Sequence, residues 1–130
     1  MKKFIKVISM GLCLFIIGGC TAGKLSDIYK EEELKKEAEE VIERLNNKDY
    51  DVILNEASDE LKIALPDNKL KETWEEFSKE IGKFESIAEL TCAEKNGYGV
   101  VIANTIYANK KVTFTLSFNK DMKLAGINIK

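Results

Sequence analysis

Residues 98–118 read YGVVIANTIYANKKVTFTLSF, and this stretch decides the fold. In its second half, apolar side chains alternate with Thr and Ser, which is the period-two pattern of a strand with one buried face. The buried row is predicted to hold Val112, Phe114, Leu116 and Phe118. Asn109-Lys110 separates this strand from another over residues 98–108, so the stretch is predicted to be an antiparallel hairpin.

One more strand is predicted on each side of this hairpin. Upstream, Asn96-Gly97 indicates a tight turn because both of its positions favour positive φ. An unbroken register before that turn places Phe84, Ser86, Ala88, Leu90 and Cys92 on one face, and Glu85, Ile87, Glu89 and Thr91 on the other. Downstream, a last strand over 123–130 is expected to bury Ala125, Ile127 and Ile129. The four strands are predicted to form an antiparallel meander.

Three helices are predicted before the sheet. Over residues 26–46, apolar side chains recur every three or four positions, as they do on one face of a helix. A second helix is expected between Asp49 and Pro66. A third contains Trp74 and ends at Gly82, where a left-handed residue is expected. Helices followed by a meander predict an α+β domain with its helices on one face of a curved sheet.

Four short segments carry a family resemblance. They are Asn47-Lys48-Asp49-Tyr50-Asp51, Leu70-x₃-Trp74, Ile81-Gly82-Lys83-Phe84 and Ala125-Gly126-Ile127. With the amphipathic opening helix, they make the chain similar over residues 30–130 to the family called domain of unknown function 3887, found in secreted and lipid-anchored bacterial proteins. The order of elements resembles the nuclear-transport-factor-2-like or cystatin-like cone. These resemblances imply the fold, and they supply no catalytic residue.

The first nineteen residues are predicted to be a secretory signal. Lys2, Lys3 and Lys6 form a basic start, and residues 7–17 are mostly apolar and uncharged, which is the layout of an export signal. As a helix this run would span about 16 Å, against about 30 Å for the hydrocarbon core of a bilayer. A permanent membrane span is therefore the weaker interpretation.

Ile17-Gly18-Gly19-Cys20 follows the apolar run and resembles the lipobox of bacterial lipoproteins. The resemblance implies that the signal is cut between Gly19 and Cys20 and that Cys20 carries a diacylglyceryl group. Two acyl chains give stable anchoring, whereas one gives only marginal membrane residence. An ordinary signal peptide with a chance cysteine is the alternative. The predicted parts are 1–19 for the signal, 20–26 for the lipidated cysteine and a short tether, and 27–130 for the domain.

Removal of the signal makes the exported chain more acidic. The whole chain has 20 Lys and Arg against 22 Asp and Glu, a formal charge of −2. Residues 1–19 contain three lysines and no acid, so the remainder carries a formal charge of −5. This balance argues against a nucleic-acid-binding protein, which normally shows a basic patch.

The sequence also limits the chemistry of the domain. It contains no His, which excludes Ser-His-Asp and Cys-His nucleophile systems and metal sites that use His. Cys92 is the one cysteine left after export and lipidation, so no internal disulfide can form, and its apolar neighbours favour a core role. No proton-transfer pair or metal-binding spacing is visible. We therefore expect no catalytic residues, no metal and no cofactor.

Three residues are candidates for a pocket between the helices and the sheet. They are the aromatic residues Trp74 and Tyr107, and Asn104, whose amide lies in the same row as Val100, Ile102 and Ile106. Because Asn104 and Tyr107 have opposite parity, they face one cavity only if a bulge lies between them. The alternatives are a core role for Trp74, and a bulge or a hydrogen bond to a helix end for Asn104.

These observations predict a bacterial lipoprotein on the extracytoplasmic face of the cell membrane, attached through diacylglyceryl-Cys20. Its domain is expected to be a non-enzymatic binding or protein-interaction module, with a protein partner or a second copy of the chain on the sheet. One alternative is a binder of a small apolar ligand, favoured by a cavity of about 300 Å³ or more at the three pocket candidates. A small hydrolase or isomerase is the other alternative. A filled core with an apolar outer sheet face would favour the protein partner.

Overall fold

The structure is a computed structural model of the whole chain, and it describes residues 25–66 and 68–130. The predicted signal peptide, Gly19, Cys20 and most of the tether lie outside the described residues. In the described part, four helices precede four strands, which confirms the α+β class. The elements are α2 (Glu31–Asn46), α3 (Tyr50–Asn55), α4 (Asp59–Ala64), α5 (Lys69–Ile81), β2 (Phe84–Lys95), β3 (Tyr98–Tyr107), β4 (Lys111–Phe118) and β5 (Leu124–Ile129).

The strands form one antiparallel sheet in the order β2-β3-β4-β5, so the predicted meander is confirmed. The pairing of β3 with β4 is unbroken from Gly99↔Phe118 to Ile106↔Lys111. Asn96 and Gly97 have φ of 54° and 87°, as the predicted tight turn requires. All four residues of the predicted β4 row are buried, namely Val112, Phe114, Leu116 and Phe118.

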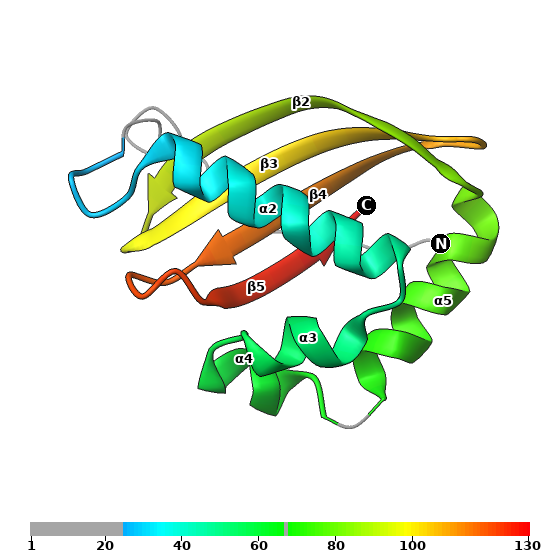
Figure 1. Cartoon of the computed structure of the whole chain (residues 1–130), viewed down its shortest axis with the longest axis horizontal. Coiled ribbons are helices and arrows are strands. Elements are labelled where there is room, and N and C mark those ends of the chain that lie inside the picture. The colour runs from blue at the N-terminus through cyan, green and yellow to red at the C-terminus, as the bar shows by residue number, and fades with distance from the viewer. Residues whose placement is uncertain (1–24, 67) are drawn as a thin grey trace.

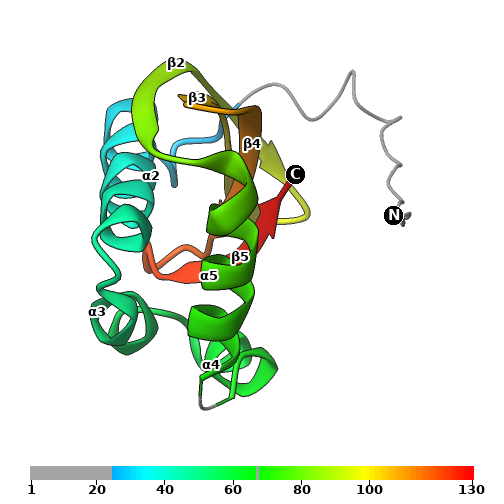
Figure 2. The same cartoon turned by 90° about the vertical axis from the view of Figure 1, so that its right-hand side faces the viewer.

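β2 departs from its predicted register. Between Phe84 and Ser86, and again between Ile87 and Glu89, β2 advances two residues while β3 advances one. Each bulge turns the following side chains to the opposite face and bends the strand, and Figure 2 shows β2 arching over the top of the molecule. Phe84, Ile87 and Leu90 therefore pack against the core at a spacing of three. The prediction that Ile87 faces away from the core is wrong.

A smaller shift of the same kind changes β5. The pairing jumps from Ser117↔Gly126 to Phe118↔Leu124, which leaves Ala125 without a partner in the ladder. Leu124 is buried, whereas Ala125 is not. Of the predicted row, Ile127 and Ile129 pack against the core, and Leu124 takes the place expected for Ala125.

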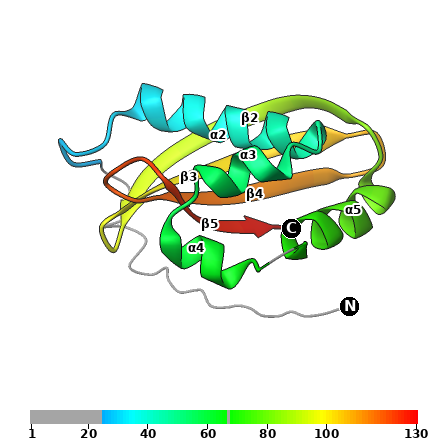
Figure 3. The same cartoon turned by 60° about the horizontal axis from the view of Figure 1, so that its bottom comes forward.

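The second predicted helix is two helices, so the expected count of three is wrong. The helix is interrupted between α3 and α4. There the Ser58 hydroxyl caps α4 by accepting a hydrogen bond from the Leu61 N–H at 3.2 Å. The Ser58 N–H donates to the Leu124 carbonyl at 2.8 Å, and Ala57 forms an isolated bridge with the same residue. The residues between α3 and α4 thus connect the helices to the edge strand β5, and Figure 3 shows α4 beside β5.

α5 ends at Gly82 as predicted, but in a different conformation. Gly82 has φ 80° and ψ −157°, a region that only glycine adopts readily, rather than the left-handed helical region. A Cβ at this position would lie 2.9 Å from the Asn109 Nδ2 atom and 3.1 Å from the Ala108 Cβ, so a larger residue would also crowd this turn.

The helices and the segment before them cover one face of the sheet. α2 lies across the inner side of the curved sheet (Figure 1) and buries its apolar stripe there. Tyr29, just before α2, is buried and donates from its hydroxyl to the Gly97 carbonyl at 2.6 Å. A Cβ on Gly99 would lie 2.8 Å from a Tyr29 ring carbon and 2.9 Å from a Leu34 methyl. Glycine therefore lets these side chains pack directly on the backbone of β3.

Candidate interaction sites

Two of the three pocket candidates lie together in the core. The rings of Trp74 and Tyr107 are buried with centroids 6.3 Å apart. Phe114 lies 6.0 Å from Trp74, and Phe84 lies 5.3 Å from Tyr107. Where α5 meets the sheet, packed aromatic rings fill the space between them. This arrangement agrees with the core role that was the alternative for Trp74.

Tyr107 also makes a polar contact that the sequence did not indicate. Its hydroxyl donates to the Asn46 side-chain oxygen at 2.7 Å, and burial raises the pKa of Tyr107 to about 12. The Asn46 Nδ2 atom is buried and has no hydrogen-bond partner within the described part of the chain. A buried polar atom without a hydrogen-bond partner lowers the free energy of unfolding by about 1–3 kcal/mol.

Asn104 lies on the opposite face of the sheet from Trp74 and Tyr107. Its pairing with Thr113 belongs to an unbroken ladder, so no bulge of β3 brings it to the core. Asn104 donates from Nδ2 to the Glu89 carboxylate at 3.3 Å and accepts from the Thr113 hydroxyl at 3.0 Å. The prediction of one pocket lined by all three residues is therefore wrong. Asn104 instead links three neighbouring strands.

None of the helices in residues 25–66 and 68–130 covers the face of the sheet that carries Asn104. We call it the open face and define it by seven outward side chains of β3 and β4: Val100, Ile102, Asn104, Ile106, Thr113, Thr115 and Ser117. None of them is charged, and Ile102 at its centre is 38% exposed. An aliphatic row bordered by small hydroxyl side chains can pack against a second sheet about 10 Å away.

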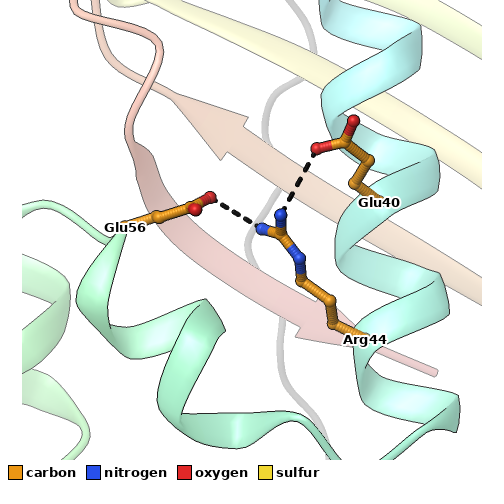
Figure 4. A network of polar contacts seen from close by, with 3 residues as sticks. All are labelled: Glu40, Arg44 and Glu56. Carbon is orange, nitrogen blue, oxygen red and sulfur yellow. Dashed lines mark hydrogen bonds and ion pairs between the residues drawn. The ribbon is translucent and has the colours of Figure 1, made fainter.

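One flank of α2 carries a cluster of charges in which Arg44 pairs with two acids. Arg44 lies 2.7 Å from the Glu56 carboxylate and 3.6 Å from that of Glu40, and so ties α2 to the connection between α3 and α4 (Figure 4). The hydrogen bond that Arg44 donates to Glu56 raises the pKa of Arg44. Burial, with Glu40 and Glu56 nearby, raises the pKa of Glu37 on the same flank.

The other flank of α2 borders a groove of about 480 Å³, which we call the α2–β2 groove. Its floor is apolar and comes from both elements, through Ile42, Phe84 and Ile87. Its rim is formed by α2 and the residue after it, through Glu39, Glu43, Asn46 and Asn47. The bulge between Phe84 and Ser86 brings Ile87 to the same side as Phe84, so both side chains reach the floor of the groove. Sequence reasoning missed it, although the spacing of three between these side chains was visible.

Two other hollows have polar linings of mixed charge. One, of about 590 Å³, lies between α3 and α5, and its lining includes Lys48, Asp51, Lys71 and Glu75. In it the Tyr50 hydroxyl donates to Glu75 at 3.0 Å, and burial together with this bond raises the pKa of Tyr50 to about 12. The other, of about 250 Å³, lies beside the Ser58 cap. Neither lining selects one sign of charge.

Cys92 lies on the core face of β2, as predicted. Its side chain is half-buried and packs against the core, and its sulfur lies 3.9 Å from the Glu31 carbonyl. Burial raises the pKa of the thiol, and Glu31 adds to the effect. A raised pKa reduces the thiolate fraction, so the site does not favour nucleophilic chemistry.

The described residues contain neither a metal-binding group of side chains nor a membrane-spanning helix. No group of three or more Cys, Asp or Glu side chains in residues 25–66 and 68–130 is arranged to hold a metal ion. Among the helices of this same part of the chain, none combines the length and the apolar character needed to cross a membrane.

Comparisons with known proteins give the family and the fold. A family model described as a protein of unknown function (DUF3887) matches residues 38–127. An NMR structure of a protein from Ruminococcus gnavus ATCC 29149 is similar, with a TM-score of 0.68 and 24% sequence identity. The match covers 82% of this chain and 96% of that one, and at this identity it shows the fold alone. No curated protein matches the chain.

Proposed function

This chain belongs to the DUF3887 family of proteins of unknown function, and we propose that it is a membrane-anchored, non-enzymatic interaction module. In this proposal the domain lies at the extracytoplasmic face of the cell membrane and binds another protein through the open face of its sheet. A second copy of the chain is the simplest such partner, because the same face of two copies can pack together about a two-fold axis.

The observation that carries the proposal is the contrast between a filled core and an open face. Trp74 and Tyr107 pack against other aromatic rings on the inner side of the sheet. On the outer side, Ile102 is 38% exposed among the uncharged side chains of Val100, Asn104 and Thr115, with Glu89 and Lys111 on the same face of the sheet. Exposed apolar side chains that gather on one face are typical of protein-binding surfaces.

The arrangement of the acids supports binding rather than catalysis. General acid–base chemistry at neutral pH needs a carboxyl group whose pKa is shifted inside an apolar site. The inner rows of β3 and β4 present apolar side chains together with Thr105 and Tyr107. Glu85 and Glu89 are exposed. A domain of this kind can hold a partner without performing chemistry on it.

The proposal includes the finer fold assignment, a cone of the nuclear-transport-factor-2-like type. Its support is the position of α2 inside the curve of the sheet, together with the bulges that bend β2. A cone of this type explains why one face of the sheet is filled by the helices of its own chain while the other stays open.

The open face is tested by photocrosslinking in the producing cell. A photoreactive residue at position 102 should give a covalent adduct, either a dimer of the chain or a complex with one other protein. The matched control is position 63 on α4, where Ile63 is 78% exposed but lies apart from the open face. Adducts that are absent at both positions, or equal at both, would show that the open face is not the binding surface.

The membrane anchor is tested separately with Cys20→Ser. The motif Ile17-Gly18-Gly19-Cys20 motivates this change, because only a thiol can form the thioether to lipid. The variant should remain an unprocessed precursor or leave the detergent phase in a phase-partition experiment. A variant that is processed and still partitions like the wild type would remove the anchor from the proposal.

A further inference from the structure

The two flanks of α2 differ in how their acids are compensated. On one flank, Glu40 and Glu56 share the guanidinium of Arg44. On the other, Glu39 and Glu43 stand at the rim of the α2–β2 groove, and neither forms an ion pair within the described residues. The contrast lies within one helix, so it does not follow from the general acidity of the chain.

Glu39 and Glu43 are spaced so that their charges repel. Side chains four residues apart on a helix are neighbours, and a like-charged pair at this spacing destabilises the helix slightly. Of the cations of α2, Lys35 pairs with Glu31 at 2.9 Å and Arg44 lies on the other flank, and Lys36 forms no ion pair with either acid among the described residues. A positive charge brought to the rim from outside would relieve this repulsion.

Between this acidic rim and β2 lies an apolar floor. Ile42 is buried, and Phe84 and Ile87 are partly buried, so the floor can accept an apolar side chain. No Lys or Arg contributes to the lining of the groove. A ligand that fits therefore carries apolar groups for the floor and positive charge for the rim.

We propose that the α2–β2 groove binds a peptide segment of a partner protein in which Arg or Lys side chains flank an apolar one. The volume of about 480 Å³ suits one or two side chains. The groove opens to solvent, whereas a small-molecule site encloses most of its ligand. The β2 bulges interrupt the strand edge beside the groove, so the segment docks through its side chains rather than as an added strand.

This site goes beyond the proposed function and is independent of it. The groove lies between α2 and the edge strand β2 on the core side of the sheet, whereas Ile102 lies on the open face. A change at Ile102 should alter binding through the open face and leave the groove intact.

The test is fluorescence anisotropy with the full chain in neutral detergent at low salt. The probe is an end-blocked, labelled pentapeptide of alternating Leu and Arg. Glu39→Gln combined with Glu43→Gln should weaken binding about fivefold or more, the loss expected for two partly exposed ion pairs. Glu32→Gln combined with Glu33→Gln is the matched control, because it removes two exposed charges from the first turn of the same helix. This control should keep binding within about twofold.

Two further comparisons separate the groove from general charge attraction. A peptide with Ser in place of Leu keeps the charge but should bind several-fold more weakly, and Ile102→Lys should leave binding of the Leu–Arg peptide close to its original strength. Equal losses in the two double variants would overturn the proposal. So would equal binding of the Ser–Arg peptide, or no binding of the Leu–Arg peptide to the wild type.

Discussion

β3 presents two rows of side chains, and their surroundings differ. The inner row, Val101, Ala103, Thr105 and Tyr107, is 0–3% exposed. The outer row, Val100, Ile102, Asn104 and Ile106, is half-buried or exposed. Both rows contain aliphatic side chains, so the difference comes from what covers them. Helices of the same chain cover the inner row, and in the described residues none covers the outer one.

This comparison separates stability from recognition in the same strand. A side chain of the inner row contributes to folding through the apolar area that it buries and the contacts that it makes. One of the outer row adds little to folding until a partner covers it, and substitutions there should affect stability only slightly. Matched substitutions on the two faces should therefore have unequal effects on stability.

The largest difference is expected between Phe114→Ala and Thr115→Ala, neighbours on β4 that point to opposite faces. Phe114 is fully buried and its ring lies 6.0 Å from that of Trp74, so its truncation leaves a cavity and should cost about 3–5 kcal/mol. Thr115→Ala should cost about 1 kcal/mol or less, through strand propensity alone. Urea denaturation of both variants measures the difference. Similar midpoints would mean that the two faces contribute equally to folding.

The second contrast uses two strand glycines. A Cβ at Gly99 would lie under 3.0 Å from Tyr29 and Leu34, so Gly99→Ala should cost about 1–3 kcal/mol by overpacking. At Gly126, which pairs with Ser117 of the open face, a Cβ would lie at 3.5 Å, an ordinary contact. Gly126→Ala should be neutral or slightly stabilising, because alanine reduces the entropy of the unfolded chain.

Thermal unfolding of the two alanine variants checks this contrast. Gly99→Ala should lower the Tm by several degrees, and Gly126→Ala should not lower it. A Gly99→Ala protein as stable as the wild type would show that Tyr29 does not pack closely on β3. The segment before α2 would then not belong to the core.

The sequence predicted the buried row of β4 correctly, because its apolar side chains alternate with Thr and Ser without interruption. In β3 both rows contain aliphatic side chains, so alternation did not indicate which row is buried. The same reasoning failed in β2, where Phe84, Ile87 and Leu90 repeat every three residues. This repeat arises from two bulges, and an alternating template cannot represent it. The interruption of the helix at Ser58 could also have been predicted, because Ser58-Asp59-Glu60 is a helix N-cap followed by acids of the first turn. The predicted continuous helix overlooked that signal.

The candidate sites were harder to predict from the sequence than the fold. Because Asn104 and Tyr107 have opposite parity along β3, the sequence correctly indicated that a bulge would be needed to bring their side chains to one face. The bulges lie in β2, however, and β3 stays regular against β4. The α2–β2 groove depends on how a helix and a strand distant in sequence lie against each other. Periodicity describes each element separately, so it carries no information on that placement.

Among the inner residues, a smaller effect at neutral pH is expected at Tyr107, which ends β3. Tyr107→Phe removes the hydrogen bond to Asn46 and should cost about 1 kcal/mol near pH 7.

Burial raises the pKa of Tyr107 to about 12 in the folded protein, against about 10 in the unfolded chain. The unfolded state therefore releases this proton first, so the wild type should lose stability as the pH rises from about 10 to about 12. The phenylalanine variant should lose less over the same interval, so the difference in stability should shrink or reverse by pH 11. Urea denaturation of both proteins at pH 8 and pH 11 measures this change. A difference that stays constant would mean that the Tyr107 hydroxyl is open to water, and the contrast between the two rows of β3 would then fail at its most polar inner position.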